Sequence, residues 1–183
     1  MNTQPPPNPL VNAAEHGRLD DVVDLLRNNP EDACAQYSLA LRLAARFGHV
    51  DCVRALLPHS DARALEGAAL VAAAKNGHKE CVALLCEHTE PKHIDMALCQ
   101  ASRFGHSACV ELLVSQGTPV QSINKALQNA AHQGHADCVA LLIAHRGDTV
   151  LDIGALVKAA KHGHAKCVFL LMGVSDPKNK NSK

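Results

Sequence analysis

One sequence pattern recurs six times in this chain, at intervals of roughly 29 residues. Each copy has an Ala four residues before a glycine, a Val five residues after it and a Leu eight residues after it. The glycines are Gly17, Gly48, Gly77, Gly105, Gly134 and Gly163. So regular a repeat predicts a stack of similar units that contact only their neighbours. Such a stack offers a long surface for a partner and no enclosed pocket.

Each copy reads as two short amphipathic helices joined by the glycine. Leu41 and Ala44 lie three residues apart, on one face of a first helix. Gly48 is expected to end that helix, because glycine adopts the left-handed conformation at a helix C-terminus at little cost. Val53 and Leu56 then mark the apolar face of a second helix. The predicted fold class is therefore all-α, with helix pairs stacked as a solenoid.

The composition excludes several function classes. Lys+Arg and Asp+Glu number 18 each, so the formal net charge is zero and nothing draws the whole chain toward nucleic acid. No apolar run approaches the ~20 residues that span a bilayer, and no secretory signal opens the chain. We therefore expect no nucleic-acid or membrane partner and a cytoplasmic location, which becomes the host cytosol if the protein is a secreted effector.

The ends of the repeat array differ in character. The sequence predicts a disordered Pro-rich N-terminus over 1–8, one repeat domain over 9–174 and a disordered basic tail over 175–183. The first copy carries Asp21 and Asp24 where later copies are apolar or small, as expected of a polar cap with no preceding repeat. The last copy keeps Phe169 and Met172. Either the segment after it folds back over that end, or the end is exposed and adhesive.

Five of the eight cysteines stand four residues after a repeat glycine. They are Cys52, Cys81, Cys109, Cys138 and Cys167. Equivalent positions in stacked helices lie about 10 Å apart, whereas a disulfide needs Cα atoms within about 7 Å. We therefore expect a column of buried, reduced thiols, which fits a cytosolic compartment.

The combined pattern AAxxGHxxxVxxLL resembles ankyrin repeats over residues 9 to 174. The Ala-Ala pairs, the Gly-His pairs and the Val…Leu runs carry the resemblance. It implies a right-handed-twisted helix-pair solenoid whose role is protein–protein interaction, without catalysis and without a cofactor.

Two departures from the ankyrin pattern lead to specific expectations. Only the first copy keeps part of the Thr-Pro-Leu-His motif, so the later first helices are expected to begin about a turn earlier. Expected helix caps are Ser38, Asp95, Ser122 and Asp152. The units are also shorter than the 33 residues of the family, which predicts short connectors in place of β-hairpin fingers. Abbreviated units of this kind are similar to arrays in bacterial and symbiont proteins, including effectors.

The resemblance places partner contacts on the concave face, at the two residues before each repeat glycine. In the first copy these are Glu15 and His16. The candidate partner-binding residues are Arg46, Phe47, Lys75, Asn76, Arg103, Phe104, His132, Gln133, Lys161 and His162. The first members form a mostly basic row, and Phe47 and Phe104 are candidate anchors. This surface suits an acidic, partly apolar protein segment.

Other interpretations stay open for the same residues. Basic side chains near helix C-termini interact favourably with the helix dipole without any ligand, and phenylalanines also pack along helix ends. The histidines after the glycines are expected to bind loop backbone, because no metal-ligand spacing is present and no catalytic motif occurs. The alternative function is a structural fragment of a larger ankyrin-repeat protein or effector, which docks or weakly self-associates through its last repeat.

Overall fold

A computed structural model describes residues 8–62, 64–146 and 152–173 of the chain. The contacts divide the chain into two compact units, residues 1–93 and 94–183. The two expected disordered termini lie outside the described residues, apart from Asn8, which caps the first helix. Whether 9–174 acts as one domain stays a prediction.

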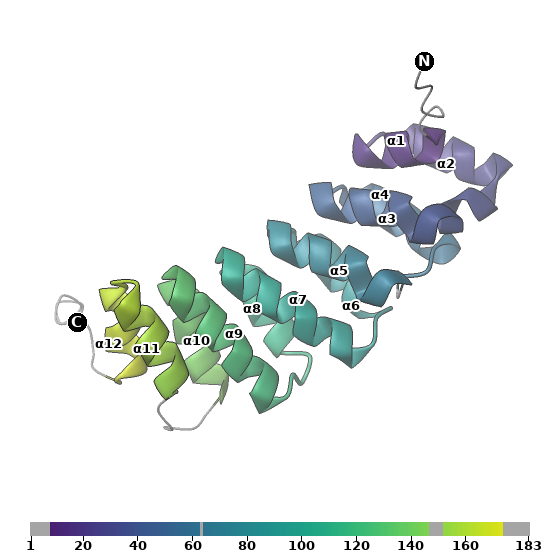
Figure 1. Ribbon diagram of the computed structural model, residues 1–183. Coiled ribbons are helices and arrows are strands. Elements are labelled where there is room, and N and C mark those ends of the chain that lie inside the picture. Colours follow the sequence, from purple (N-terminus) through teal and green to yellow (C-terminus); the bar gives the residue numbers. More distant parts are fainter. Residues whose placement is uncertain (1–7, 63, 147–151, 174–183) are drawn as a thin grey trace, which may run out of the picture. The chain divides into compact units, whose positions relative to one another are not determined.

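The first unit consists of successive helix pairs and two 3-10 turns (Figure 1). In chain order these are α1 (Pro9–Glu15), α2 (Leu19–Asn28), η1 (Pro30–Cys34), α3 (Ala35–Phe47), α4 (Val50–Leu56), η2 (Leu57–His59), α5 (Ala64–Asn76) and α6 (Lys79–Cys86). The first helices pack in a row, with α3 between α1 and α5, and the second helices pack in a parallel row, with α4 between α2 and α6. This is the layered arrangement that the repeat predicts.

The second unit repeats the same plan. Its helices are α7 (Pro91–Phe104), α8 (Ser107–Val114), α9 (Val120–Gln133), α10 (Ala136–Arg146), α11 (Ile153–Lys161) and α12 (Ala165–Leu171). Here α11 packs on α9, while α10 packs between α8 and α12 (Figure 1). No strand occurs in the described ranges, so the all-α helix-pair solenoid and the short connectors are confirmed.

The core of each unit is built from the recurring small apolar residues. The leucines seven residues before the glycine are at most 1 % exposed in the first five copies, and the valines five residues after it are fully buried there. In the last copy, Leu156 and Val168 are only partly buried, because the described residues contain no helix pair beyond α11 and α12 to cover them. Each repeat therefore completes the core of the repeat before it.

A contact between a glycine and a histidine joins consecutive repeats. Gly134 ends α9 in the left-handed conformation, with φ of +80°. The ring of His164 lies against it, so a Cβ at this glycine would stand 2.6 Å from Nδ1 of His164. Nε2 of the same ring donates to the carbonyl of His132 at 3.0 Å. The histidine does bind backbone, but the expected loop acceptor was wrong, because the carbonyl lies in the last turn of α9, in the preceding repeat.

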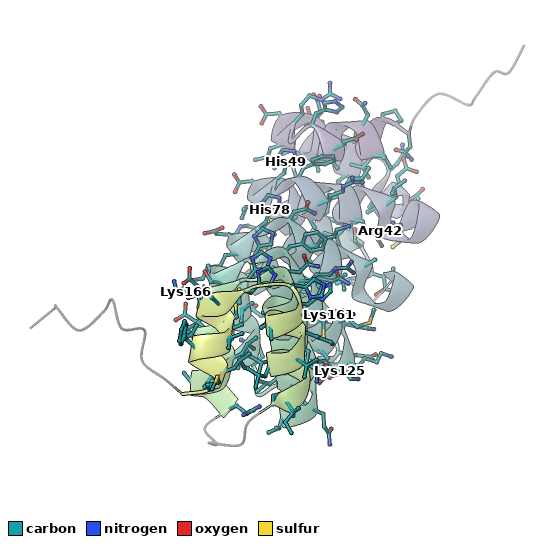
Figure 2. All side chains as sticks on the ribbon, turned by 60° about the vertical axis from the view of Figure 1, so that its left-hand side comes forward. Arg42, His49, His78, Lys125, Lys161 and Lys166 are labelled. Carbon is teal, nitrogen blue, oxygen red and sulfur yellow. The ribbon has the colours of Figure 1, made fainter. Side chains whose placement is uncertain are left out.

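The same contact is found at three further places. In each, the histidine that follows one repeat glycine lies on the glycine of the preceding repeat and donates to the carbonyl two residues before that glycine, at 3.0 Å. The pairs are His49 on Gly17, His78 on Gly48, and His135 on Gly105. Figure 2 shows His49 and His78 one above the other in the first unit.

The helix starts correct part of the sequence prediction. Asp152 is confirmed as a cap, since its Oδ1 accepts from the amide of Ala155 at 2.8 Å. The other three expected caps were wrong, because α3, α7 and α9 begin earlier and enclose Ser38, Asp95 and Ser122. Ser38 is buried at φ +58°, and its Oγ accepts from the amide of Asp61. The expected earlier start of these helices is thereby confirmed.

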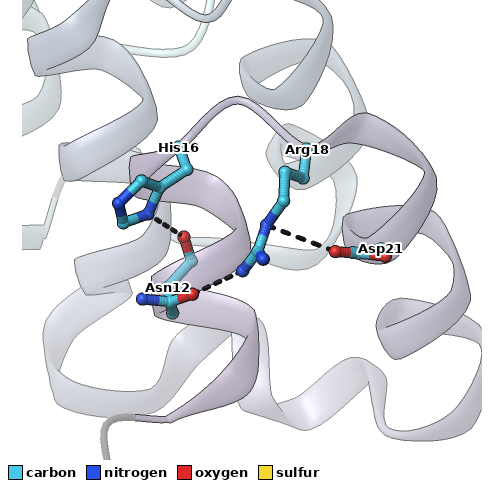
Figure 3. Close-up of polar contacts among 4 residues, drawn as sticks. All are labelled: Asn12, His16, Arg18 and Asp21. Carbon is cyan, nitrogen blue, oxygen red and sulfur yellow. Dashed lines mark hydrogen bonds and ion pairs between the residues drawn. The ribbon is translucent and has the colours of Figure 1, made fainter.

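The N-terminal end of the first unit is polar, as expected. Arg18 stands where later copies have the histidine, and its Nε lies 3.2 Å from Asp21 Oδ2. The same guanidinium donates to Oδ1 of the Asn12 side chain. The backbone carbonyl of Asn12 accepts from Nδ1 of His16 (Figure 3). Asp24 pairs with Arg27 at 3.0 Å, and both carboxylates are largely exposed. These ion pairs replace the apolar contacts that later copies make with a preceding repeat.

The glycine–histidine contact makes the repeat glycines specifically intolerant of a side chain. We expect Gly134→Ala to destabilise the protein by about 3 kcal/mol, because it adds left-handed strain and an overlap with His164. Gly117→Ala is the matched control. Gly117 has a φ of +81° with nothing within 4 Å of its added Cβ, so only the strain of about 1 kcal/mol remains. Urea unfolding followed by circular dichroism measures both, and equal losses would contradict the contact.

Candidate partner-binding surface

The predicted contact residues lie at the C-terminal ends of the first helices of the repeats. We call them the helix-end pairs, defined as the two residues before each repeat glycine. In the first unit, Arg46 and Phe47 end α3, and Lys75 and Asn76 end α5. All four are exposed. Glu15 and His16 occupy the same place at the end of α1, where Glu15 is half-buried.

The helix-end pairs of the second unit carry more imidazole groups. Arg103 and Phe104 end α7, His132 and Gln133 end α9, and Lys161 and His162 lie at the end of α11. All of them are exposed except His132, which is half-buried. Figure 2 shows Lys161 at the end of α11 and Lys166 on the other helix of the pair, α12. The structure thus places each predicted residue on the surface at the expected register, within its own unit.

Two of these pairs combine an arginine with a phenylalanine. The guanidinium carbon of Arg46 lies 5.5 Å from the centre of the Phe47 ring, and that of Arg103 lies 5.9 Å from the Phe104 ring. Phe47 and Phe104 are 44 % and 43 % exposed. Both distances are within the range of a cation–π contact. The two phenylalanines are therefore surface rings beside a positive charge, and they are not core residues.

The backbone under the helix-end pairs is held by the histidines. The carbonyls of Glu15, Arg46, Arg103 and His132 each accept from the histidine of the following repeat. Each of these first members therefore has a fixed backbone, and the side chains of Arg46 and Arg103 are exposed above it. The sequence reasoning named both residue sets but missed that one fixes the other. The recurrence of Gly-His directly after the variable pair was the available signal.

Three histidines approach each other in the second unit. The rings of His132 and His162 lie 4.2 Å apart between centroids in a T-shaped arrangement, and those of His162 and His164 lie 6.2 Å apart and stacked. The pKa of His132 lies below its ordinary value. Desolvation by burial is the first cause, and the positive charges of His162, Lys158, Arg103 and His164 follow.

A groove lies at the polar end of the first unit. It has a volume of about 550 Å³ and is lined by Asn12, Arg18, Asp21, Asp24 and Asn28 together with apolar neighbours. Within it Arg18 bonds to Asn12 and Asp21, and Asp24 pairs with Arg27 beside the groove. In the repeat register this is the face against which a preceding repeat would pack, so the groove is the capped end of the array.

The chemistry of the described His, Cys, Asp and Glu residues is that of packing and surface pairs. These residues contain no group of three or more His, Cys, Asp or Glu that could hold a metal ion. The five cysteines of the column are at most 1 % exposed. Burial, with smaller effects from Asp137, Cys109 and Cys167, raises the pKa of Cys138 to about 11, so its thiol stays protonated. Among the described helices, none has the length and apolar character to span a membrane.

Comparison with known proteins agrees with this architecture. The family model described as ankyrin repeats (3 copies) matches residues 10–97, 60–125 and 98–183. The crystal structure of the human ASB11 ankyrin repeat domain is similar with a TM-score of 0.77 and 23 % identity, over 94 % of this chain and 86 % of that chain. A search of curated proteins found no match.

The stacked helix pairs and their exposed helix ends define a solenoid repeat protein. With the family model matching most of the sequence, the chain belongs to the ankyrin-repeat family. Ankyrin repeats are generally non-catalytic modules that bind proteins.

The burial of the cysteines makes their reactivity predictable. At about pH 8, we expect a chromogenic disulfide reagent to label Cys34 fast, because this thiol is exposed. The five column cysteines should react only after unfolding in urea. Cys34→Ser should remove the fast phase. Fast labelling of the peptide that contains Cys138, seen by mass spectrometry of the native protein, would show that the column is accessible.

Proposed function

We propose that this protein is a non-catalytic binding module that recognises a protein partner through the helix-end pairs on the concave face of its ankyrin-repeat stack. The observation that carries the proposal is the exposure of Phe47 and Phe104, each beside an arginine, on a backbone held by the next repeat. Aromatic and arginine side chains dominate the energetics of protein interfaces.

The charge of the helix-end pairs supports an acidic, partly apolar segment as the partner. Arg46, Lys75, Arg103 and Lys161 are first members of their pairs and are exposed. Within each unit they form a positive surface next to an apolar ring. A segment that alternates acidic and apolar side chains complements such a surface, since opposite charges steer association and rings fill apolar contacts. The reduced cysteines support a reducing, cytoplasmic compartment.

The proposal is tested by removing the rings. Replacing both Phe47 and Phe104 with Ala is expected to weaken the affinity for the partner by about thirtyfold or more, because a lost anchor typically costs about 2 kcal/mol of binding free energy. The partner is first isolated by comparing captures with wild type and with the Arg46/Phe47/Arg103/Phe104 alanine variant. Its affinity is then measured by isothermal titration calorimetry.

Val120→Ala is the control for lost apolar surface. Val120 is 51 % exposed and begins α9, at the opposite end of that helix from the helix-end pair. The proposal requires that this variant binds like wild type. An unchanged affinity of the double phenylalanine variant, with intact helicity, would remove the helix-end pairs as the contact surface.

A second candidate function is self-association through the last repeat. Its end face, formed by Ile153, Val157, Phe169 and Met172, is exposed by 67 %, 57 %, 40 % and 57 %. Ala160 is exposed there, whereas the equivalent Ala14, Ala45 and Ala131 are fully buried. The end face thus presents positions that interior repeats cover with another helix pair, and a second copy supplies an identical apolar face. The first repeat carries acidic residues at its capped end and does not match this apolar face. Two copies would therefore dock through the last repeat of each.

This candidate predicts a concentration-dependent dimer. Light scattering coupled to gel filtration should show a mass that rises toward twice the monomer as the loading concentration rises, and Phe169→Glu should abolish the rise. Asp24→Ala, at the capped end, should leave it intact. A monomer at every concentration would exclude self-association and leave the partner-binding proposal untouched.

A further inference from the structure

The described positive groups around His132 come from several elements of the second unit. Arg103 lies near the end of α7 and His132 near the end of α9. Lys158 lies on α11, His162 follows the last residue of α11, and His164 precedes α12. His162 is in ring contact with His132, and His164 donates to the backbone of His132. We call these five residues the imidazole cluster.

Among the described residues, the charges that act on His132 do not include a carboxylate. The charged groups that act on His132 are Arg103, Lys158, His162 and His164, and each is a cation or becomes one on protonation. Asp137 on α10 lies 3.7 Å from Lys166. Asp152 caps α11 and accepts from Nε2 of Gln128 at 3.5 Å, and Oε1 of the same Gln128 accepts from Lys158. The other charged side chains of α9 and α10, Lys125, His145 and Arg146, are also positive or neutral. A cluster of one sign raises the local concentration of counter-ions and favours an anionic ligand.

Hydrogen bonding within the cluster leaves donors for a ligand. Nδ1 of His162 donates to the carbonyl of Lys158 at 2.9 Å, and Nζ of Lys158 donates to Oε1 of Gln128 at 2.9 Å. Nε2 of His162 is therefore the ring nitrogen that a proton would turn into a second donor. The helix dipole explains single cations at helix ends. It does not account for the part of the lowered pKa of His132 that follows desolvation and comes from the neighbouring positive groups.

We propose that the imidazole cluster is a carboxylate-binding subsite whose affinity for acidic peptide side chains rises as the pH falls and His132 becomes protonated. A bound carboxylate stabilises the imidazolium forms, so binding takes up protons. By linkage, affinity then increases as the pH falls. This inference rests on the proposed function, because it names the partner chemistry and its pH dependence at the helix-end pairs of the second unit.

The sign of the effect follows from the direction of the shift. His132 in the free protein has a lowered pKa and is neutral at and above neutral pH. The carboxylate raises that pKa in the complex. Between the two values the complex holds a proton that the free protein lacks, so each pH unit changes the affinity by up to about tenfold.

The test uses the full-length protein and a fluorescein-labelled, glutamate-rich peptide that also contains leucine. Fluorescence anisotropy is expected to show binding at least about fivefold tighter near pH 6 than near pH 8, since glutamate stays ionised over this range. The His132→Gln/His162→Gln variant should lose this difference. His132→Arg should bind at both pH values with a reduced pH dependence, because its charge is permanent.

Two controls separate the cluster from general effects of pH. His145→Gln removes an exposed histidine of the same unit away from the cluster, and it should keep the full pH dependence. The glutamine counterpart of the peptide should bind weakly and without pH dependence. Circular dichroism verifies that each variant keeps its helices. His164 is left in place, because its ring also supports the fold.

Three results would overturn the inference: no binding of the glutamate peptide, equal affinity at both pH values, or an unchanged pH dependence in the double glutamine variant. None of them bears on Phe47, which lies in the first unit. The phenylalanine variants and an isolated partner therefore test the proposed function separately. If the phenylalanine variants lose affinity but peptide binding does not depend on pH, the proposed function is supported and the carboxylate subsite is excluded.

Discussion

The contact of a histidine ring with the glycine of the preceding repeat is the interaction on which the rest of the structure depends. At Gly134, the absence of a side chain leaves room for His164, and the left-handed conformation turns the chain into the next helix. The hydrogen bond of His164 to the carbonyl of His132 then uses an acceptor that a helix end leaves without a helical partner. The recurring Gly-His motif thus has three roles. Its glycine ends a helix, and its histidine contacts the glycine of the preceding repeat and donates to a helix-end carbonyl there.

The same contact explains how a surface can vary without loss of the fold. The side chains of Arg46 and Phe47 point to solvent, while the carbonyl of Arg46 is held at 3.0 Å by His78. Changes of side chain at such a position leave the backbone interaction in place. Recognition residues on a fixed scaffold are pre-organised, which lowers the entropic cost of binding.

Most of the fold could be predicted from the sequence, because the repeat reports the same environment many times. The burial of Leu41, Val53 and the cysteine column followed from register alone. The caps could not be predicted in the same way. Ser38 has the residue type of a cap, but the helix begins before it and its hydroxyl serves the amide of Asp61, which is distant in sequence. Residue type alone does not tell which backbone group lies nearby.

The candidate site was predicted as a set of positions, but its chemistry was only partly visible. The register before the glycine made Phe47 and Phe104 candidate anchors, but it did not decide between exposed rings and rings packed along the helix ends; the structure shows them exposed. The approach of His132 to His162 did not, because it depends on ring orientations across two repeats. A contact between residues distant in sequence that depends on the rotamer of each side chain leaves no periodic signal in the sequence. They become visible only when the helix pairs are stacked.

A double-mutant cycle between Gly134→Ala and His164→Ala tests the central claim most directly. If the ring and the glycine are in contact, removing the imidazole relieves the overlap. The cost of Gly134→Ala in urea unfolding then falls to the left-handed strain of about 1 kcal/mol. If the two changes instead add without coupling, histidine and glycine act independently, and the account of how neighbouring repeats are joined is contradicted.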